Sequence, residues 1–232
     1  MKENIVLVGF GGHAKSVADS IERQGKFNIA GYTENEKKDS KYRYLGTDDV
    51  LPELYDSGIH YAFACVGYLG KGAIRNRIYN ELKNIGFNLP VIIDPSAIVS
   101  NSAQIGEGVF IGKDAVINAE AIIGNMAIIN TKALIEHECI VGDFSHIAVG
   151  AVLCGQTRVG KESLIGANAT VVQDVNIADN VIVGVGAVVP KDIDYMGTYA
   201  GVPACKIRLK KLLLSQKQAL ITMAVLRLQN SL

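Results

Sequence analysis

Residues 121–150 read AIIGNMAIINTKALIEHECIVGDFSHIAVG and carry an aliphatic side chain at every sixth position. In this stretch the positions are Ile123, Ile129, Ile135, Val141 and Ile147. The spacing continues in both directions, from Val99 to Val189, and all sixteen positions hold Val, Ile or Leu. A period of six fits neither an α-helix nor the simple alternation of a strand. It is typical of a parallel β-helix, in which each hexapeptide supplies one short face and a turn.

The neighbours of these aliphatic residues also repeat. The residue two positions before is usually small, as at Ala121 and Ala127, and the residue after is often Gly or Asn, as at Gly124 and Asn130. We expect the aliphatic side chain to point to the axis and the small residue to occupy a crowded part of the wall. The Gly or Asn would relieve a turn with positive φ. Three such faces make one coil, so the repeat predicts about five coils.

The first ninety residues show a different pattern, in which strands alternate with helices. NIVLVGFGGHAKSVADSIERQG (4–25) predicts a buried strand, a glycine-rich turn and a helix. FNIAGYTEN (27–35), HYAFACVG (60–67) and LPVIID (89–94) predict three further strands, and KGAIRNRIYNELKNIG (71–86) predicts an amphipathic helix. This order predicts a Rossmann-like α/β lobe with a parallel sheet and right-handed crossovers.

The glycine-rich turn of this lobe is suited to a phosphate, because its bare backbone amides meet the N-terminus of a helix. The spacing Gly9-x-Gly11-x-x-Ala14, with Glu34 near the end of the second strand, approximates the dinucleotide fingerprint. However, four strands are only half of a full dinucleotide domain. We therefore expect a nucleotide or nucleotide-sugar site in preference to NAD, with a purely structural tight turn as the other interpretation.

Composition narrows the classes of function. The 232 residues have a formal net charge of zero, so nothing favours nucleic acid or an anionic membrane as a partner. The four cysteines lie far apart without a C-x-x-C pair, which indicates reduced thiols in a cytoplasmic protein. The apolar run near the N-terminus is too short for a signal peptide, and no apolar stretch reaches the roughly 20 residues of a membrane span.

Five stretches carry a resemblance to a known family: GFGGHA (9–14), GYTEN (31–35), VG…IRNRI (66–78), IEHECIVGDFSHIAVGA (135–151) and YAGVPACKIR (199–208). With them the chain resembles the bacterial hexapeptide-repeat acetyltransferases of nucleotide-linked 4-amino sugars and the related sialic-acid O-acetyltransferases. The resemblance implies a left-handed parallel β-helix, acetyl-CoA as co-substrate, and a homotrimer with active sites between subunits. The expected domains are a nucleotide-sugar-binding lobe (1–94), an acyltransferase coil (95–204) and a C-terminal extension (205–232).

The pair His137-Glu138 is the main catalytic candidate. His137 comes two residues after the inward Ile135, at a turn where side chains point outward. A neutral imidazole can take the proton of an attacking amine or hydroxyl near neutral pH, and an adjacent carboxylate can orient it. The resemblance implies that His137 is the base, that Glu138 supports it, and that His146 contacts the thioester region of acetyl-CoA. The nine-residue offset is half a coil, so the two histidines should lie on different faces of one subunit.

The resemblance also implies the other site residues. It assigns donor contacts to Gly155, Ala167 and Val185, and sugar-nucleotide contacts to Gly11, Gly12, His13, Glu34, Asn35 and Gly67. Arg158, Lys206 and Arg208 are candidate partners for the phosphates of coenzyme A, and solvated charges are an equal interpretation of each. Relatives often have two aspartates where Glu34 and Asn35 stand, so the base of the nucleotide stays open. No metal is expected.

Residues 209–232 contain helix formers and neither Gly nor Pro, so they predict an additional C-terminal helix. We expect it to pack on the trimer in preference to touching a membrane through Lys210, Lys211 and Lys217.

The first functional hypothesis is an acetyl-CoA-dependent N-acetyltransferase of a UDP- or dTDP-linked 4-amino-dideoxy sugar in glycan biosynthesis. The alternatives are an O-acetyltransferase of sialic acid, a non-catalytic nucleotide-sugar-binding module and, with the least support, an NAD oxidoreductase.

Overall fold

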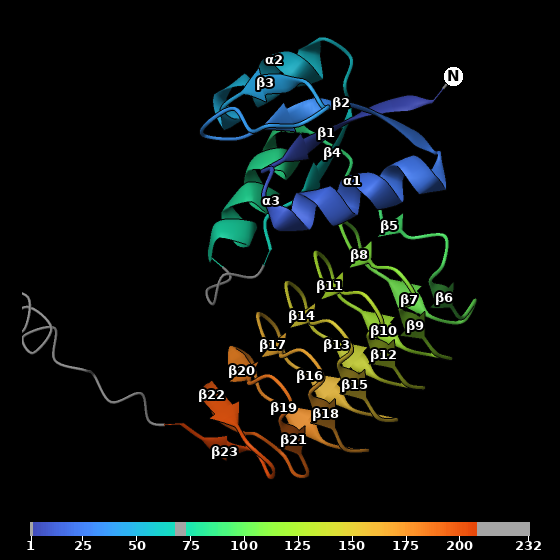
Figure 1. The fold of residues 1–232 in the computed structure, drawn as a ribbon, viewed down its shortest axis with the longest axis vertical. Coiled ribbons are helices and arrows are strands. Elements are labelled where there is room, and N and C mark those ends of the chain that lie inside the picture. The colour runs from blue at the N-terminus through green and yellow to red at the C-terminus, as the bar shows by residue number, and fades with distance from the viewer. Residues whose placement is uncertain (1, 68–72, 208–232) are drawn as a thin grey trace, which may run out of the picture.

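A computed structural model describes residues 2–67 and 73–207 of the chain. It consists of an α/β lobe that sits on one end of a β-solenoid (Figure 1). The expected C-terminal helix falls in residues 208–232, outside the described residues. No helix in the described ranges is long and apolar enough to cross a membrane.

The lobe is built on a four-stranded sheet whose described pairs are parallel, in the order β3-β2-β1-β4. Its elements are β1 (Glu3–Val8), α1 (Gly12–Gln24), β2 (Phe27–Thr33), β3 (Tyr44–Gly46), η1 (Asp48–Val50), α2 (Leu51–Asp56), β4 (Tyr61–Ala64) and α3 (Ala73–Ile85). The apolar run Ile5–Val8 is fully buried at the centre of the sheet, as a strand covered on both faces should be. The predicted α/β lobe with a parallel sheet is thus present, and Glu34 follows directly after the end of β2.

One strand prediction is wrong. LPVIID (89–94) was expected as the fourth strand of the lobe, but β5 (Ile92–Ile93) pairs with β8 of the solenoid. The fourth lobe strand is β3, an edge strand in the segment YLG. The reason lies in the hexapeptide repeat itself, because Ile93 stands six residues before Val99 and packs on the same axial core. The apolar run therefore forms the first rung of the coil.

The solenoid has three faces, which the chain visits in turn. Face 1 contains β5, β8 (Phe110–Ile111), β11 (Ile128–Ile129), β14 (His146–Ile147), β17 (Leu164–Ile165), β20 (Val181–Val183), β22 (Gly197–Ala200) and β23 (Cys205–Lys206). Face 2 contains β6 (Ile98–Val99), β9 (Val116–Ile117), β12 (Leu134–Ile135), β15 (Val152–Leu153), β18 (Thr170–Val171) and β21 (Val188–Val189). Face 3 contains β7 (Gln104–Ile105), β10 (Ile122–Ile123), β13 (Ile140–Val141), β16 (Arg158–Val159) and β19 (Asn176–Ile177).

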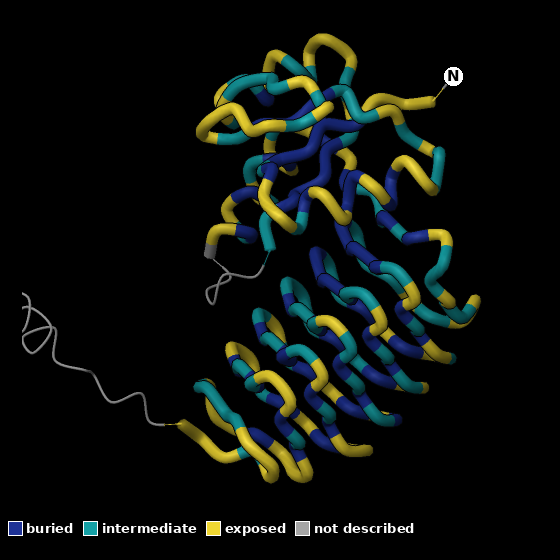
Figure 2. Tube along the Cα trace, in the orientation of Figure 1, coloured by how far each residue is buried: buried dark blue, intermediate teal, exposed yellow. Residues whose placement is uncertain are grey.

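Neighbouring coils pair residues that are 18 positions apart, as Ile123 pairs with Val141 and Ile135 with Leu153. The six strands of face 2 make about six turns, against the five coils expected from Val99 onward, because the coil starts earlier. The inward aliphatic column and its alanines form one continuous core, seen as buried segments along the inside of the coil in Figure 2.

The glycines of the repeat are explained by the close approach of neighbouring coils and not, as expected, by positive φ. The residues with positive φ stand three positions after the inward aliphatic and are mostly not glycine, as at Glu138 (φ 58°). A glycine directly after the aliphatic is needed because coils approach closely there. A Cβ on Gly142 would lie 2.6 Å from the backbone nitrogen of Lys161 in the next coil.

A buried carboxylate joins the lobe to the first rung. Asp94 has no exposed surface, and its oxygens accept hydrogen bonds from Ser20 Oγ (2.7 Å) and Arg23 Nη1 (2.5 Å) of α1. Lys113 Nζ lies 3.4 Å from it on the coil side. Burial by itself would raise the pKa of Asp94, but hydrogen bonds from Ser96 and Ser20 and the charge of Lys113 hold that pKa well below its usual range.

Replacing Asp94 with Asn should lower the free energy of unfolding at pH 7 by about 2 kcal/mol, the usual worth of hydrogen bonds to a charged group. Because the folded-state pKa is depressed, this contribution is present above about pH 4 and is lost as pH falls further. In urea titrations, the difference in unfolding free energy between wild type and Asp94→Asn should therefore be smaller at pH 3 than at pH 7, and it should vanish only as the pH approaches the depressed folded-state pKa. Glu22→Gln, in an exposed ion pair with Lys41, is the matched control and should change stability by less than about 0.5 kcal/mol. Equal effects of the two variants would contradict the role of Asp94.

Candidate active site

The turns between faces stack into three ridges. We call them ridge 1–2, ridge 2–3 and ridge 3–1 after the faces that they join. On ridge 2–3, His137 lies between Ala119 and Gly155 of the adjacent coils: Glu138 donates its backbone N–H to Ala119 O (2.9 Å), and Gln156 donates to His137 O (2.9 Å). The backbone of the predicted base is thus held from both sides by the coil.

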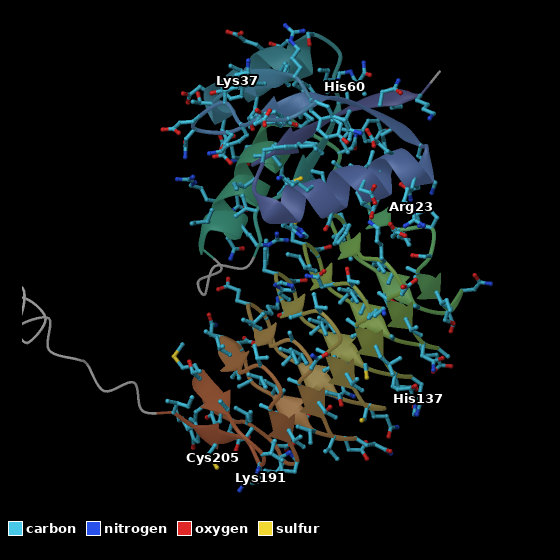
Figure 3. The ribbon with its side chains drawn as sticks, viewed as in Figure 1. Arg23, Lys37, His60, His137, Lys191 and Cys205 are labelled. Atoms are coloured by element: carbon cyan, nitrogen blue, oxygen red, sulfur yellow. The ribbon has the colours of Figure 1, made fainter. Side chains whose placement is uncertain are left out.

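The predicted pair on ridge 2–3 is formed. His137 Nδ1 lies 3.2 Å from Glu138 Oε2, and each side chain is 49% exposed. Since a carboxylate only accepts, Nδ1 is the protonated nitrogen of the neutral ring, and Nε2 is left with its lone pair. No described residue hydrogen-bonds Nε2. The geometry therefore leaves the side chain of the predicted base half-exposed on the outside of the coil, where Figure 3 labels His137 far from the lobe.

Gly155 shapes the space beside this base. A Cβ at position 155 would lie 2.6 Å from Nε2 and 2.7 Å from Cε1 of His137. Any other residue would therefore push the imidazole from its position. The predicted donor contact Gly155 and the predicted base are neighbours in the structure.

The other histidine of the motif occupies a different environment. His146 lies on face 1 in β14, with its side chain on the outside of the coil beneath the lobe and half-buried. Asn130 Oδ1 accepts the backbone N–H of Thr131 (2.8 Å), which turns Asn130 Nδ2 toward His146 Nε2 (3.2 Å). Nε2 therefore accepts, and the proton of the neutral ring is on Nδ1.

His146 lies close to a second histidine and a buried arginine. Arg75, 3% exposed, donates to the carbonyls of Val66 in the lobe and Met126 in the coil. Burial, followed by the charges of Arg75 and His146, lowers the pKa of His13 to about 3. Burial and the charge of Arg75 lower the pKa of His146 to about 4. Both imidazoles are thus neutral at physiological pH.

Three buried nitrogens in this group have no hydrogen-bond partner among the described residues: Arg75 Nε, His13 Nε2 and His146 Nδ1. Buried polar groups without partners are costly, so they mark a place where a polar group belongs. Arg75 and Asn130 were not singled out from the sequence, and the only signal for Arg75 was its place in the stretch IRNRI. Gly67 lies against His13, since a Cβ there would be 3.8 Å from His13 Cβ.

The glycine-rich turn lies at the carboxyl ends of the parallel strands, as predicted. No other atom lies within 4 Å of a Cβ built on Gly11 or Gly12, so the start of α1 is open to a ligand. Glu34 holds the turn: its Oε2 accepts the Phe10 N–H (3.0 Å), and its Oε1 accepts the Asn35 N–H (3.0 Å). These bonds lower the pKa of Glu34, the one from Phe10 most.

A cavity of about 120 Å³ opens beside this turn. Its lining includes Gly9, Glu34 and Asn35, together with Asp48 and Arg77, which sequence reasoning did not select. It is the position where open α/β sheets bind ligands. Gly11, Gly12 and His13 do not line this cavity, so the structure separates the predicted sugar-nucleotide residues into two adjacent groups.

The three predicted donor contacts are not brought together within one chain. Ala167 and Val185 stack on ridge 1–2, where Gly186 N donates to Ala167 O (2.9 Å) and Val185 is 76% exposed. Gly155 lies on ridge 2–3 with His137. Face 2 lies between these two ridges.

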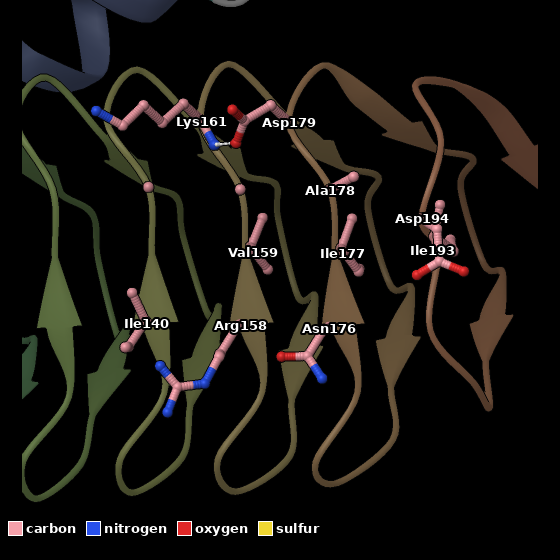
Figure 4. A pocket seen from close by; sticks show the side chains of 12 residues that line it. Ile140, Arg158, Val159, Lys161, Asn176, Ile177, Ala178, Asp179, Ile193 and Asp194 are labelled. Atoms are coloured by element: carbon pink, nitrogen blue, oxygen red, sulfur yellow. Dashed lines mark hydrogen bonds between the residues drawn. The ribbon is translucent and has the colours of Figure 1, made fainter.

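A larger groove, about 470 Å³, lies elsewhere, on face 3 near the C-terminal end of the coil (Figure 4). Arg158 and Asn176 project from its strands, and Lys161 donates its backbone N–H to Asp179 at its edge (2.7 Å). Of the predicted site residues, only the phosphate candidate Arg158 lines it. Size alone therefore does not identify the site. Among residues 2–67 and 73–207, no group of His, Cys, Asp and Glu is placed to hold a metal ion.

The known proteins that the chain resembles include several acetyltransferases. The family described as "PglD N-terminal domain" matches residues 4–82. UDP-N-acetylbacillosamine N-acetyltransferase of Bacillus subtilis is 33% identical over 112 residues, covering 47% of this chain and 51% of the relative. The chain thus matches about half the length of that curated relative.

Solved structures match over more of the chain. A histidine-to-asparagine variant of perosamine N-acetyltransferase from Caulobacter crescentus, in complex with CoA and GDP-perosamine, is 33% identical with a TM-score of 0.84. That match covers 88% of this chain and 97% of the other. The acetyltransferase domain of PglB from Neisseria gonorrhoeae, in complex with acetyl coenzyme A, is 34% identical with a TM-score of 0.83, covering 89% and 100%.

The hydrogen-bond arrangement of His146 leads to a prediction for the free protein. ¹⁵N NMR of the imidazoles should show His146 as the Nδ1–H tautomer, neutral down to about pH 5, because its pKa is lowered to about 4. Asn130→Ala removes the donor to Nε2 and should mix the two tautomers. An Nε2–H tautomer in the wild-type protein, or protonation near the ordinary histidine value of about 6.5, would contradict the assignment.

Proposed function

Since the chain belongs to the PglD-like family of hexapeptide-repeat sugar N-acetyltransferases, we propose that it transfers the acetyl group of acetyl-CoA to the amino group of a nucleotide-linked 4-amino-dideoxy sugar in glycan biosynthesis. The observation that carries the proposal is the His137-Glu138 pair, whose Nε2 is free to act as a base on a coil of this family. The perosamine N-acetyltransferase variant of Caulobacter crescentus, which the chain matches over 97% of that protein's length, supports the proposal.

The chemistry needs one base and a positioned donor. The amine nitrogen attacks the thioester carbonyl carbon, a C–N bond forms, and His137 Nε2 accepts the proton that the amine loses. The C–S bond then breaks, and the imidazolium returns this proton to the departing thiolate. Glu138 stabilises the imidazolium between the two steps. We propose that the neutral His146 contacts the thioester region, and that Gly155, Ala167 and Val185 hold the donor.

The lobe would hold the sugar nucleotide. In this proposal the open amides at Gly11 and Gly12, with His13 and Gly67 beside them, meet the diphosphate. Glu34 and Asn35, in the adjacent cavity, meet the nucleoside. Binding energy from the nucleotide would orient the sugar amine toward the base. Contacts far from the reacting atoms would in this way increase the rate of acetyl transfer. The free cysteines in the described part of the chain and the use of acetyl-CoA support a cytoplasmic location.

The active site is completed, we propose, by a homotrimer of left-handed coils. The outward side chains of face 2 form an almost wholly apolar column: Ile98, Val116, Leu134, Val152, Thr170 and Val188. Such a column favours burial between copies of the chain. Ridge 2–3 with His137 flanks it on one side, and ridge 1–2 with Ala167 and Val185 flanks it on the other. Rotation about a common threefold axis would bring ridge 2–3 of one copy to ridge 1–2 of the next.

Replacing His137 with Ala should lower kcat by about 100-fold or more, the usual worth of a general base. Acetyl-CoA binding, measured by calorimetry, should survive because the side chain acts on the proton of the acceptor. His60→Ala, at an exposed histidine of the lobe, is the matched control and should retain wild-type kcat. Near-normal turnover of His137→Ala at saturating substrates would remove His137 from the mechanism.

The direct test of function combines binding with product mass. Calorimetry on the intact protein should show binding of a UDP-, dTDP- or GDP-linked amino sugar and none of NADH. Mass spectrometry after incubation with acetyl-CoA should show one acetyl group on the amino sugar and none on free sialic acid. Acetylation of sialic acid alone would establish an O-acetyltransferase, and tight NADH binding without nucleotide-sugar affinity would reopen the oxidoreductase hypothesis.

A further inference from the structure

The carboxylate of Glu138 is held from the neighbouring coil. Gln156, which stands 18 residues further along the chain, donates from Nε2 to Glu138 Oε2 at 3.2 Å. This is the same oxygen that lies 3.2 Å from His137 Nδ1. We propose that Gln156 is a positioning residue, which aims the Glu138 carboxylate at His137 and so keeps the base in its active tautomer. The assignment of His137 as the base rests on the proposed function.

Gln156 contacts both members of the pair. Its backbone N–H donates to His137 O (2.9 Å), and its side-chain amide donates to Glu138. Gly155, directly before it, leaves room for the imidazole. The dipeptide Gly155-Gln156 therefore contacts His137-Glu138 of the preceding coil at two points. Gly155 leaves space for the imidazole, and Gln156 donates a hydrogen bond to the carboxylate.

An anchor is needed because the pair is exposed. With 49% of each side chain open to solvent, water competes for both Glu138 oxygens, and the carboxylate can rotate away from the ring. The Glu138 backbone, at φ 58°, is held by Ala119 on the other side. The side-chain amide of Gln156 thus restrains the carboxylate of Glu138, which the backbone hydrogen bonds leave free to rotate.

A neutral donor suits this position. Lysine or arginine at position 156 would offset the negative charge that stabilises the imidazolium, whereas an amide orients the carboxylate and leaves its charge in place. The nearby Glu136 does not replace Glu138, because its Oε2 accepts from His137 N (3.2 Å) and Asn118 Nδ2 (3.0 Å). Glu138 is therefore the carboxylate that faces the ring.

The kinetic test is a double-mutant cycle in the full-length protein. Gln156→Met keeps the length of the side chain and removes the donor. It should lower kcat by about tenfold with little change in either KM, within the range of coupling between contacting groups. In a Glu138→Ala background the same substitution should change kcat by less than about twofold. Full multiplicative effects of the two substitutions would overturn the proposal.

Two controls separate positioning from general damage. Gln104→Met is the matched substitution at an exposed glutamine on face 3 and should leave kcat unchanged. The thermal midpoints of both methionine variants should stay within about 2 °C of wild type, because an exposed hydrogen bond contributes little to folding. A loss of kcat in Gln156→Met that tracks a large loss of stability would overturn the positioning role.

A second readout does not depend on activity. ¹⁵N NMR of the free protein should show His137 as the Nδ1–H tautomer in wild type and as a mixture in Gln156→Met. If wild type transfers no acetyl group while the tautomer still changes, the proposed function fails and the positioning role stands. An unchanged tautomer in Gln156→Met would overturn the positioning role even in an active enzyme.

Discussion

Every coil of the solenoid must hydrogen-bond the coil 18 residues away while every sixth side chain fills its axis. The two requirements are coupled, because a shift of register by one residue would turn the aliphatic column outward and place turn residues inside. Ile93 and the series from Val99 to Val189 meet both without interruption. The site depends on this constraint, since it turns a distance along the chain into a position in space.

Two residues offset by 18 become neighbours, and two offset by nine lie half a coil apart. His137 therefore meets Gly155 and Gln156, while His146 lies on another face under the lobe. The two histidines consequently differ in chemistry: one is exposed with a free nitrogen, and the other is neutral through burial and an adjacent cation. The buried charges of Asp94 and Arg75 fix the position of the lobe above His146, because a buried charge that loses its partners is costly.

The sequence alone determined the coil, its inward column and the outward position of His137, because these follow from a strict local period. It also placed Glu34 at the end of a strand and the glycine turn before a helix. It misassigned LPVIID, since a short apolar run cannot be given to a lobe or to a coil by periodicity alone. The reason for the repeat glycines was also wrong, because close approach between coils is invisible along one chain.

Only the tertiary structure decided which distant residues meet. Arg75 reaches Met126 across 51 positions, Ser20 reaches Asp94 across 74, and the neutral state of His13 and His146 depends on that docking. Gln156 sits beside Glu138 because the coil has that circumference, and no motif marks it. A local period in the sequence shows whether a residue packs on the axis or lies on the outer face of its own coil. The environment of a titratable group depends on charges and solvent exclusion supplied by other elements, which appear only when those elements pack together.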